Sequence, residues 1–573
     1  MEDAQNTIQN LADELFGENI SVELIRTEIR NGDYATNIAL KLANATKQNP
    51  KSIAQKIIDK MESLNFEWLE SCSVADPGFI NIRLSNIGLQ SEIKKVLEQG
   101  DNYGQSDLYK NKNIVAEYSD PNPFKVMHAG HLYTFVVGDA IANLLEAAGA
   151  TVHSVNFGGD VGLHVGKSMW GILEKLGGEN PKKLKLIEKD KRADWISEAY
   201  VVGSSAYEDD EKAKPEIIAL NKRIYSLIEK NDKSSNFAQI YWTCRQWSYD
   251  YFDDFYARIN SRFTLEKQKG ERVYYPESET TPIGLQTVKE QLQKGVYEYS
   301  DGAVIFNGEK YGLHTRVFIN SEGLPTYETK DVGLIIAKWR DYHFDESIII
   351  TANDIVEYMK VVLKSIEQFE PHLAKATKHI THGMLKLKGG MKMSSRKGNI
   401  LKATDILDAA EEASQKISKQ KNELVMIGAV KYALLKQRIG ADIIYDPEES
   451  VSLAGNSGPY LQYAHARAYS ILNKSSAKDY ELVDDYQFDE WERNVVLKIS
   501  EYPGITKKAA FELMPHHICV YLYELAQTFN RFYEKDRVIG SDKEPLRLIL
   551  VKTYADVLSN GLGKLGIPAP DHM

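Results

Sequence analysis

The chain has 573 residues, of which 43% are hydrophobic and 26% are charged, and its formal net charge is -11 at pH 7. This composition is typical of a globular protein, and no apolar run approaches the roughly 20 residues that a membrane span requires. The length predicts about two to four domains. The net negative charge excludes electrostatic binding of nucleic acid by the whole protein surface, so any contact with nucleic acid needs local basic patches.

The N-terminus and the cysteines indicate the cellular environment. The chain begins with early acidic residues and lacks a basic start followed by an apolar stretch, so we expect no signal peptide and a cytoplasmic protein. Cys72, Cys244 and Cys519 lie far apart in the sequence, which favours core thiols over a disulfide framework or a paired-cysteine zinc site. We therefore expect no structural metal.

Residues 1–110 are predicted to form a small α+β domain. Pro50 precedes apolar side chains at helical spacing, namely Ile53, Ile57, Met61 and Leu64. Residues 78–85 then alternate between apolar and polar side chains, as a half-buried strand does.

Residues 111–402 carry the pattern of an α/β, Rossmann-like domain. Apolar runs at 114–118 and 151–157 predict two strands, and a helix pattern from His131 separates them. The helix has an apolar stripe of Leu132, Val136, Ala140 and Leu144. Strand, helix and strand in this order predict a parallel sheet, whose ligand crevice lies at the carboxyl ends of the strands.

The remaining patterns predict an insertion and a bundle. Residues 165–300 are charged and helical in pattern, so we expect a helical insertion, and apolar runs at 317–320 and 347–351 predict strands that return to the same sheet. Residues 403–573 are predicted to form an all-α helical bundle. Its apolar stripes comprise Ile427, Val430 and Leu434 and, later, Ile518, Leu522, Leu525, Phe529 and Phe532.

The sharpest local signal is the string His-Ala-Gly-His at 128–131, at the predicted turn from a strand into a helix. A helix N-terminus presents unpaired N–H groups to an anion, and glycine lets a ligand approach the backbone. His128 and His131 add hydrogen-bond donors, so the pattern predicts a site for nucleotide phosphates. Two surface histidines that cap a helix are the alternative.

A second signal is the basic string MKMSSRKGN at 391–399, in which Lys392, Arg396 and Lys397 crowd together. By itself such a cluster can be a solvated run of charges.

Together and in this order, the two strings resemble the signature sequences of class I aminoacyl-tRNA synthetases. Longer strings resemble those of arginyl-tRNA synthetases in all three predicted domains, and they lie at 32–42, 117–131, 324–334, 455–472 and 565–573. The insertion at 165–300 carries little of this resemblance.

The resemblance implies that the protein activates arginine with ATP, with magnesium borne by the nucleotide, and passes the arginyl group to tRNA(Arg). The arginine carboxylate attacks the α-phosphate, so the enzyme has to align the reactants and supply donors and cations to the phosphate oxygens. By the family match, the catalytic residues are Lys125, His128, Gly130, His131, Lys392, Met393 and Ser394. Of these, His128, His131 and Lys392 are expected to contact ATP.

The same resemblance implies that Glu117, Ser119, Asn122, Tyr327 and Asp331 surround the arginine. A guanidinium group is planar and always charged, so its selection needs carboxylates, and Tyr327 and Asp331 are expected at that end. A helix-capping acid is the alternative for Asp331, and a core ring is the alternative for Tyr327.

For tRNA, the resemblance assigns the bundle to the anticodon and the N-terminal domain to the outer corner of the tRNA. The expected contacts in the bundle are Tyr460, Gln462, Tyr463, Arg467 and Met573, since aromatic and arginine side chains stack on splayed bases. Phe79 and Asn81 are the expected contacts in the N-terminal domain. Core packing is the alternative for the tyrosines.

The sequence departs from the family pattern in three places. Ile355 stands near a position where the family often has a glutamine, and Asp120 stands where many members have serine. Ser395 replaces a lysine of the commoner loop, and we predict that Lys125 supplies the missing charge to ATP. The alternative is that Lys125 faces solvent and that Lys392, Arg396 or Lys397 supplies the positive charge to ATP.

Two other functions stay open at this point. A metabolic nucleotidyltransferase also uses an HxGH helix, although such enzymes are usually far shorter and lack the helical bundle. A non-catalytic synthetase-like protein that binds RNA is the other, and the intact His-Ala-Gly-His and basic strings argue against it. By family habit we expect a monomer.

Overall fold

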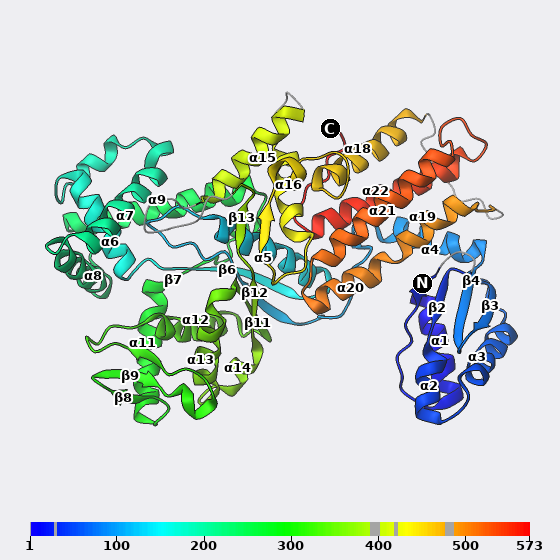
Figure 1. Ribbon diagram of the computed structural model, residues 1–573, viewed down its shortest axis with the longest axis horizontal. Coiled ribbons are helices and arrows are strands. Elements are labelled where there is room, and N and C mark those ends of the chain that lie inside the picture. The colour runs from blue at the N-terminus through cyan, green and yellow to red at the C-terminus, as the bar shows by residue number, and fades with distance from the viewer. Residues whose placement is uncertain (1, 28–30, 390–400, 418–421, 476–485) are drawn as a thin grey trace.

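The computed structural model describes residues 2–27, 31–389, 401–417, 422–475 and 486–573. Figure 1 shows an elongated molecule, with the central parallel sheet between the helical insertion at one end and the helical bundle and N-terminal domain at the other. The multidomain fold predicted from the sequence is confirmed. Lys392, Met393 and Ser394 lie outside the described residues.

The N-terminal domain is an antiparallel sheet with helices packed on it, as predicted. The strand order is β1-β2-β4-β3. Its elements are α1 (Glu2–Phe16), β1 (Ile25–Arg26), β2 (Tyr34–Thr36), α2 (Ile38–Thr46), α3 (Pro50–Leu64), β3 (Leu69–Ala75), β4 (Phe79–Leu84) and α4 (Asn86–Gln99). The predicted α3 stripe is buried except for its last residue, Leu64, which is 48% exposed.

Within the described residues the central sheet has five strands, all parallel, in the order β12-β11-β5-β6-β7. They are β5 (Asn113–Glu117), β6 (Thr151–Gly158), β7 (Tyr274–Pro276), β11 (Glu346–Ala352) and β12 (Thr377–His382). The predicted βαβ unit is therefore confirmed, with α5 (Ala129–Ala147) between β5 and β6. β7 lies inside the stretch predicted as insertion, so the chain has rejoined the sheet by residue 274.

Alternation along the strands explains why helices cover both faces of this sheet. Ile114 and Ile348 point into the core that contains α5, whereas Val115 and Ile349 point into the core formed with α12 (Tyr327–Tyr342) and α13 (Val356–Glu367). Neighbouring residues of a strand face opposite sides, so a sheet that is buried on both faces needs continuous apolar runs.

The prediction that 317–320 returns to the central sheet is wrong. β10 (Arg316–Ile319) pairs antiparallel with β9 (Ala303–Phe306), which pairs with β8 (Glu298–Ser300) in a separate sheet. The β8–β9 hairpin lies just upstream and offers β10 a local pairing partner. The run at 347–351 does lie in the central sheet, between β5 and β12.

Helices connect and flank these strands. The insertion contains α6 (Leu163–Leu176), α7 (Arg192–Asp209), α8 (Ala213–Glu229), α9 (Asn236–Arg258) and α10 (Arg262–Gln268), and α11 (Glu277–Gln293) and α14 (Pro371–Ala376) flank the strands that follow.

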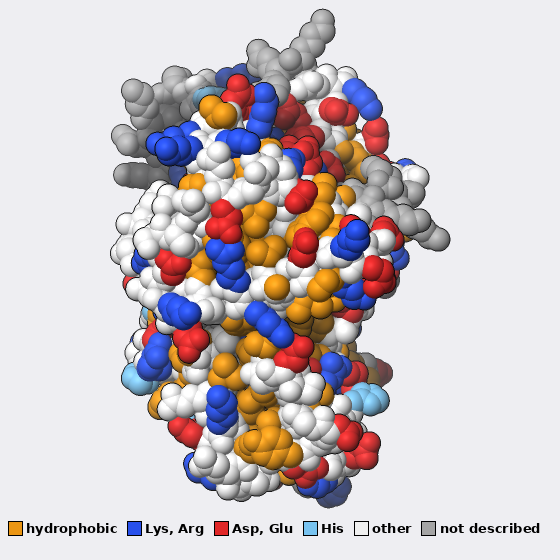
Figure 2. All heavy atoms as spheres, turned by 90° about the vertical axis from the view of Figure 1, so that its left-hand side faces the viewer, with side chains coloured by type: hydrophobic (Ala, Val, Ile, Leu, Met, Phe, Trp, Pro, Cys, Tyr) orange, Lys and Arg blue, Asp and Glu red, His pale blue; other side chains and the backbone are white. Residues whose placement is uncertain are grey.

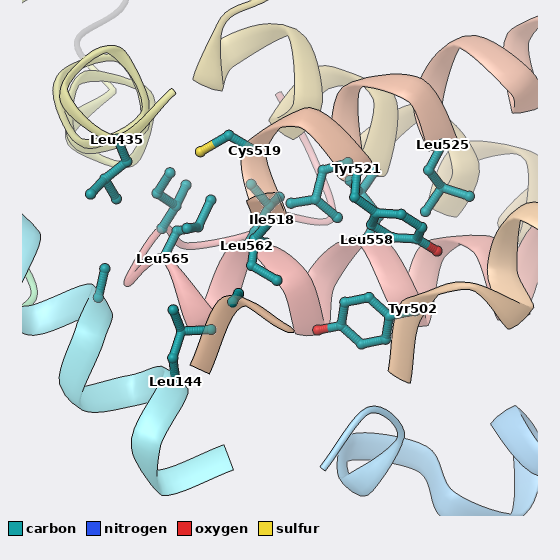
Figure 3. Packing of buried hydrophobic residues seen from close by; sticks show 14 of the residues in the cluster. Leu144, Leu435, Tyr502, Ile518, Cys519, Tyr521, Leu525, Leu558, Leu562 and Leu565 are labelled. Atoms are coloured by element: carbon teal, nitrogen blue, oxygen red, sulfur yellow. The ribbon is translucent and has the colours of Figure 1, made fainter. Parts of the chain in front are cut away.

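The C-terminal region is helical, as predicted, and packs directly on the catalytic domain. Its helices are α15 (Ala403–Ile417), α16 (Glu423–Leu435), α17 (Pro447–Ser450), α18 (Gly458–Lys474), α19 (Glu490–Ser500), α20 (Tyr502–Glu512), α21 (His516–Lys535) and α22 (Glu544–Lys564). The region also contains the short strand β14 (Ile443–Tyr445), which pairs parallel with β13 (Leu385–Leu387) of the preceding domain. Both predicted apolar stripes are buried. Figure 3 shows Leu144 of α5 facing Leu435, Leu562 and Leu565 of the bundle in one continuous core.

Two buried ionic contacts hold the domains together. Lys431 of α16 donates to the carbonyl oxygens of Gly566 at 2.9 Å and Asn260 at 3.2 Å, and its ammonium lies 3.5 Å from Asp139 of α5. On the other side, Arg493 of α19 forms a two-pronged pair with Asp33 of the N-terminal domain. The N-terminal domain is thus attached to the bundle.

Among the described residues, no helix combines the length and the apolar composition that a bilayer crossing requires. The three cysteines are free thiols; Cys244 and Cys519 are buried, and Cys72 is partly buried.

Candidate active site

The His-Ala-Gly-His string forms the N-terminus of α5, at the carboxyl end of β5. His128 is the N-cap residue, and each histidine accepts a hydrogen bond through Nδ1 from the backbone N–H of the other, at 3.3 Å for His128 and 3.1 Å for His131. The two rings stack with their centroids 3.6 Å apart. A Cβ atom at Gly130 would lie 2.9 Å from the His128 ring, so only glycine allows this stack.

This geometry determines where the imidazole protons lie. Burial lowers the pKa of His128 to about 4, with Lys125 adding to the effect, and burial lowers the pKa of His131 well below its usual value. Both rings are therefore neutral at pH 7. Because each Nδ1 accepts a hydrogen bond, each proton lies on Nε2, which makes both histidines donors toward the crevice. The reciprocal cap therefore prepares two neutral donors beside a helix N-terminus, as a phosphate site requires.

The chain that follows the basic string returns to this helix. Ala129 N–H donates to the Leu401 carbonyl at 2.8 Å, and Ala403 N–H donates to the Met127 carbonyl at 2.9 Å. His128 and Lys402 form an antiparallel bridge between them. Residues 390–400 themselves lie outside the described residues, but their C-terminal neighbours are hydrogen-bonded to the His-Ala-Gly-His turn.

Lys125 lies on the loop that opens α5, and it is partly buried. Its ammonium lies 4.1 Å from the centre of the Tyr200 ring, which α7 of the insertion supplies. Its positive charge also contributes to the lowered pKa of His128, His131 and His164. The lysine is therefore partly shielded from solvent and lies near the three histidines.

A second part of the site is rich in carboxylates, and Asp331, which lies near Glu117, Glu277 and Asp120, is one of them. It lies in the second turn of α12, past the N-cap residue Thr326, so it does not cap the helix. The Tyr358 hydroxyl donates to one carboxylate oxygen. Burial raises the pKa of Asp331 to about 7, and Glu117 and Glu277 contribute to the increase. The described residues include no lysine or arginine within ion-pair distance of this carboxylate.

Glu117, by contrast, is already neutralised. It ends β5, it is 3% exposed, and it forms an ion pair with the fully buried Lys338, which also donates to Ser347 at 3.0 Å. Lys338 lies seven residues after Asp331, on the same face of α12. The structure therefore brings Glu117 and Asp331 together, and of these two carboxylates Asp331 is the one without an ion-pair partner among the described residues.

Ser119 and Asn122 shape the loop between β5 and α5. The Ser119 hydroxyl is hydrogen-bonded to the Tyr256 hydroxyl at 2.8 Å. Asn122 accepts from the Gly159 N–H at 2.8 Å, and a Cβ atom at Gly159 would lie 2.6 Å from that oxygen. Asp120 accepts from the Phe157 N–H at 2.8 Å. These bonds fasten the loop to β6 and to the glycine turn after it.

Tyr327 is 59% exposed, so it is not a core ring. Beneath it lies a buried ion pair, in which Lys330 donates to Glu277 at 2.5 Å, and the Lys330 ammonium is 4.9 Å from the Tyr327 ring centre. His164 donates through Nε2 to the Gly159 carbonyl at 2.7 Å nearby.

Of the residues predicted to contact the anticodon, Tyr460, Tyr463 and Arg467 lie on α18 and are at least partly exposed. Tyr463 is 45% exposed, and Arg467, four residues on, is exposed and stacks on Tyr533 at 4.6 Å. Tyr460 is partly buried and accepts from Asn530 at 2.8 Å. Met573 is 46% exposed.

The prediction for Gln462 is wrong, because its side chain is fully buried. It donates to the carbonyl oxygens of Leu424 and Pro568, both at 2.8 Å, and His465 is bonded to the Pro570 carbonyl at 2.9 Å. These two residues hold the C-terminal segment along α18.

Phe79 and Asn81 share the exposed side of β4, opposite the buried Ile80 and Ile82. Asn81 lines a shallow cavity of about 230 Å³. Its other lining residues are Asn31, Gly32, Ser71, Cys72, Ser73, Ile82 and Arg83.

Several residues of the crevice were missed from the sequence. Tyr358, Lys338, Lys330 and Tyr200 contact predicted site residues, and Glu277 is paired with Lys330. Lys330 and Lys338 carried a usable signal, since spacings of three from Tyr327 and seven from Asp331 put each pair on one face of a helix. Among the described residues, no group of three or more histidine, cysteine or acidic side chains is arranged to hold a metal ion.

Comparisons with known proteins agree with this geometry. The family model described as tRNA synthetases class I (R), catalytic domain, matches residues 92–446. The models of the DALR anticodon binding domain and of the arginyl tRNA synthetase N terminal domain match 461–573 and 2–84.

Individual relatives cover nearly the whole chain. An arginine–tRNA ligase of Borreliella burgdorferi is 31% identical over 519 residues, which cover 86% of this chain and 85% of the relative. One of Flavobacterium psychrophilum is 28% identical and covers 92% of this chain and 90% of the relative.

Solved structures share the fold. The arginyl-tRNA synthetase of Thermus thermophilus aligns over 100% of both chains with a TM-score of 0.79 and 23% identity. That of Plasmodium falciparum aligns over 100% of this chain and 99% of its own with a TM-score of 0.76 and 20% identity.

A parallel sheet whose first crossover helix begins with His-Ala-Gly-His, together with the catalytic-domain match, defines a class I tRNA synthetase. Within that class, the chain belongs to the arginyl-tRNA synthetase family.

Proposed function

We propose that this protein is an arginine–tRNA ligase that converts L-arginine and ATP into arginyl-adenylate and diphosphate, and then transfers the arginyl group to tRNA(Arg) with release of AMP. Family membership supports the reaction. The observation that carries the substrate assignment is the opposite chemistry of the two ends of one crevice. One end offers two Nε2 donors and a lysine, and the other offers the unneutralised carboxylate of Asp331.

In the first step, the arginine carboxylate attacks the α-phosphorus of ATP, a bond forms between them, and the bond to diphosphate breaks. Negative charge grows on the phosphate oxygens. His128 and His131 donate to these oxygens, and Lys125 supplies a positive charge at the same helix N-terminus. Lys392, Met393 and Ser394 are assigned to the same step by the family resemblance, and Mg²⁺ enters as part of the ATP substrate.

Arginine lies with its guanidinium group toward Asp331 and Tyr327. The Tyr358 hydroxyl holds one oxygen of Asp331, which orients the carboxylate for the guanidinium. The Glu117–Lys338 pair and the bonds of Ser119 and Asn122 hold the walls of the pocket in place.

We assign residues 1–110 and 403–573 to tRNA recognition and residues 111–402 to catalysis. The DALR match and the exposed stripe of Tyr463 and Arg467 support an anticodon site on α18, with Tyr460 and Met573 beside it. Phe79 and Asn81 face solvent on the N-terminal sheet, where they are available to an RNA loop. We further expect a monomer that works in the cytoplasm, and sedimentation of the purified protein tests the monomer.

The decisive experiment is arginine-dependent exchange of radioactive pyrophosphate into ATP, with and without tRNA(Arg). We expect exchange with arginine and none with lysine, because an ammonium cannot engage a carboxylate through two parallel N–H groups. Binding of tRNA without exchange under any condition would instead indicate a non-catalytic relative.

A further inference from the structure

The insertion contributes an aromatic ring to the nucleotide end of the crevice. The Lys125 ammonium lies 4.1 Å from the centre of the Tyr200 ring, and the described residues include no carboxylate within ion-pair distance of Lys125. An aromatic face attracts a cation without neutralising it. A carboxylate in the same place would hold the lysine but compete with phosphate for it.

Tyr200 is also a neighbour of Tyr327. Local desolvation raises the pKa of Tyr327, and the nearby Glu277 and Tyr200 add to this increase. Tyr200 therefore lies near a residue of the proposed arginine site as well as against Lys125.

The position of Tyr200 is rigid because α7 packs tightly on α6. A Cβ atom at Gly171 of α6 would lie 2.0 Å from the Ala199 carbonyl oxygen, and one at Gly203 of α7 would lie 1.9 Å from the Lys167 carbonyl oxygen. Glycine at both positions lets the two helices touch along their backbones. Because α6 begins directly after the glycine turn of the site, at Gly162, this contact fixes Tyr200 relative to the crevice.

Figure 2 shows this end of the molecule from outside, where basic and acidic side chains are interspersed around a central band of apolar side chains.

We propose that Tyr200 is a positioning residue for adenylate formation, whose ring holds the charged Lys125 beside His128 and His131, where the ATP phosphates bind. This inference rests on the role proposed for Lys125. The insertion thereby takes part in catalysis although it carries little of the family's sequence pattern.

The test is the rate of adenylate formation by Tyr200→Leu, Tyr200→Phe and Lys125→Ala, alone and in combination. We expect Lys125→Ala to lose about 30-fold to 1000-fold in rate, as when a transition-state donor is removed. Tyr200→Leu should lose about tenfold, and Tyr200→Phe should retain nearly the full rate because the ring remains. The double mutant Lys125→Ala, Tyr200→Leu should be no slower than Lys125→Ala alone.

The matched control is Tyr207→Leu. Tyr207 lies on the same helix, and its ring lies 4.2 Å from the Lys167 ammonium, so this change removes a similar contact that the proposal does not involve. It should leave the rate unchanged. Arginine affinity, measured by calorimetry, should not change in any of these variants.

The outcomes distinguish the proposed role of Lys125 from the proposed role of Tyr200. Nearly full activity of Lys125→Ala would overturn both its proposed role and the inference. A crippled Lys125→Ala with a fully active Tyr200→Leu, or an additive double mutant, would overturn the inference alone. Should Tyr200→Leu fail to fold, fluorinated phenylalanines at position 200 keep the shape and weaken the π face. The rate should then fall with each added fluorine, and a constant rate would count against the proposal.

Discussion

Burial favours the uncharged form at both ends of the crevice, but the consequence differs between them. At the nucleotide end, burial keeps His128 and His131 neutral, and they act as donors through Nε2. At the arginine end, burial raises the pKa of Asp331 to about 7, so its carboxylate is only partly ionised until a cation arrives. The first end is already in its working state, whereas the second is completed by its ligand.

The difference follows from what each substrate brings. ATP carries its own negative charge, so neutral donors and one lysine suffice, and two imidazolium groups so close together would repel each other. Arginine carries a buried positive charge, which requires a carboxylate to offset it.

Replacing Asp331 by asparagine should break the arginine end alone. An amide cannot offset the charge of a buried guanidinium, so kcat/KM for arginine should fall. The expected loss corresponds to about 3 to 5 kcal/mol of transition-state stabilisation. The KM for ATP in pyrophosphate exchange should stay near the wild-type value. Asp209→Asn, which changes an exposed carboxylate at the end of α7, is the control. An equal loss for ATP would indicate a structural role for Asp331.

Replacing His131 or His128 by alanine should break the nucleotide end alone. Loss of one transition-state donor should cost about 3 kcal/mol in the rate of adenylate formation, while the dissociation constant for arginine stays constant. Loss of the cap should also lower the melting temperature slightly. His372→Ala, at an exposed position, is the control. Weaker arginine binding with an unchanged maximal rate would contradict this prediction.

The two ends should also differ in their pH dependence. Arginine binds the ionised form of Asp331, whose pKa is raised to about 7, so kcat/KM for arginine should rise with pH and level off above about 7. Below that pH, kcat/KM for arginine should fall by up to about tenfold for each pH unit, which corresponds to about 1.4 kcal/mol. The histidines are neutral over this range and should add no step. Asp331→Asn should flatten the profile, and an unchanged profile would assign the titration to another group.

The smallest effect is expected far from both ends. Arg467→Ala or Tyr463→Ala should weaken the binding of tRNA(Arg) by about 1 kcal/mol, because each change removes an exposed stacking surface from α18. The weaker binding should appear as a higher KM for tRNA(Arg). Pyrophosphate exchange without tRNA and charging of a minihelix that lacks the anticodon should not change. Equal loss with the minihelix would show that α18 does not contact the anticodon.

Local patterns predicted the fold wherever a segment's own side chains determine its surroundings. The stripe of α5 and the alternation of β4 are examples, since burial of one face follows from spacing alone. The three-residue strand β7 lay hidden in a polar stretch, and β10 was assigned to the wrong sheet. Strand pairing depends on which partner is nearest in space, and an apolar run does not specify its partner.

The same division holds for the crevice. The sequence by itself pointed to a nucleotide phosphate site, because His-Ala-Gly-His at a strand-to-helix turn combines a helix N-terminus, a glycine and two donors within four residues. The reaction class, and the roles of Asp331 and Lys125, came from the family resemblance. It did not reveal that Lys338 neutralises Glu117 from 221 positions away in the chain, or that Tyr358 and Tyr200 hold Asp331 and Lys125. Only the tertiary structure decided which carboxylate remains free for arginine, because charge compensation depends on distance in space and on burial, and neither is written in local spacing.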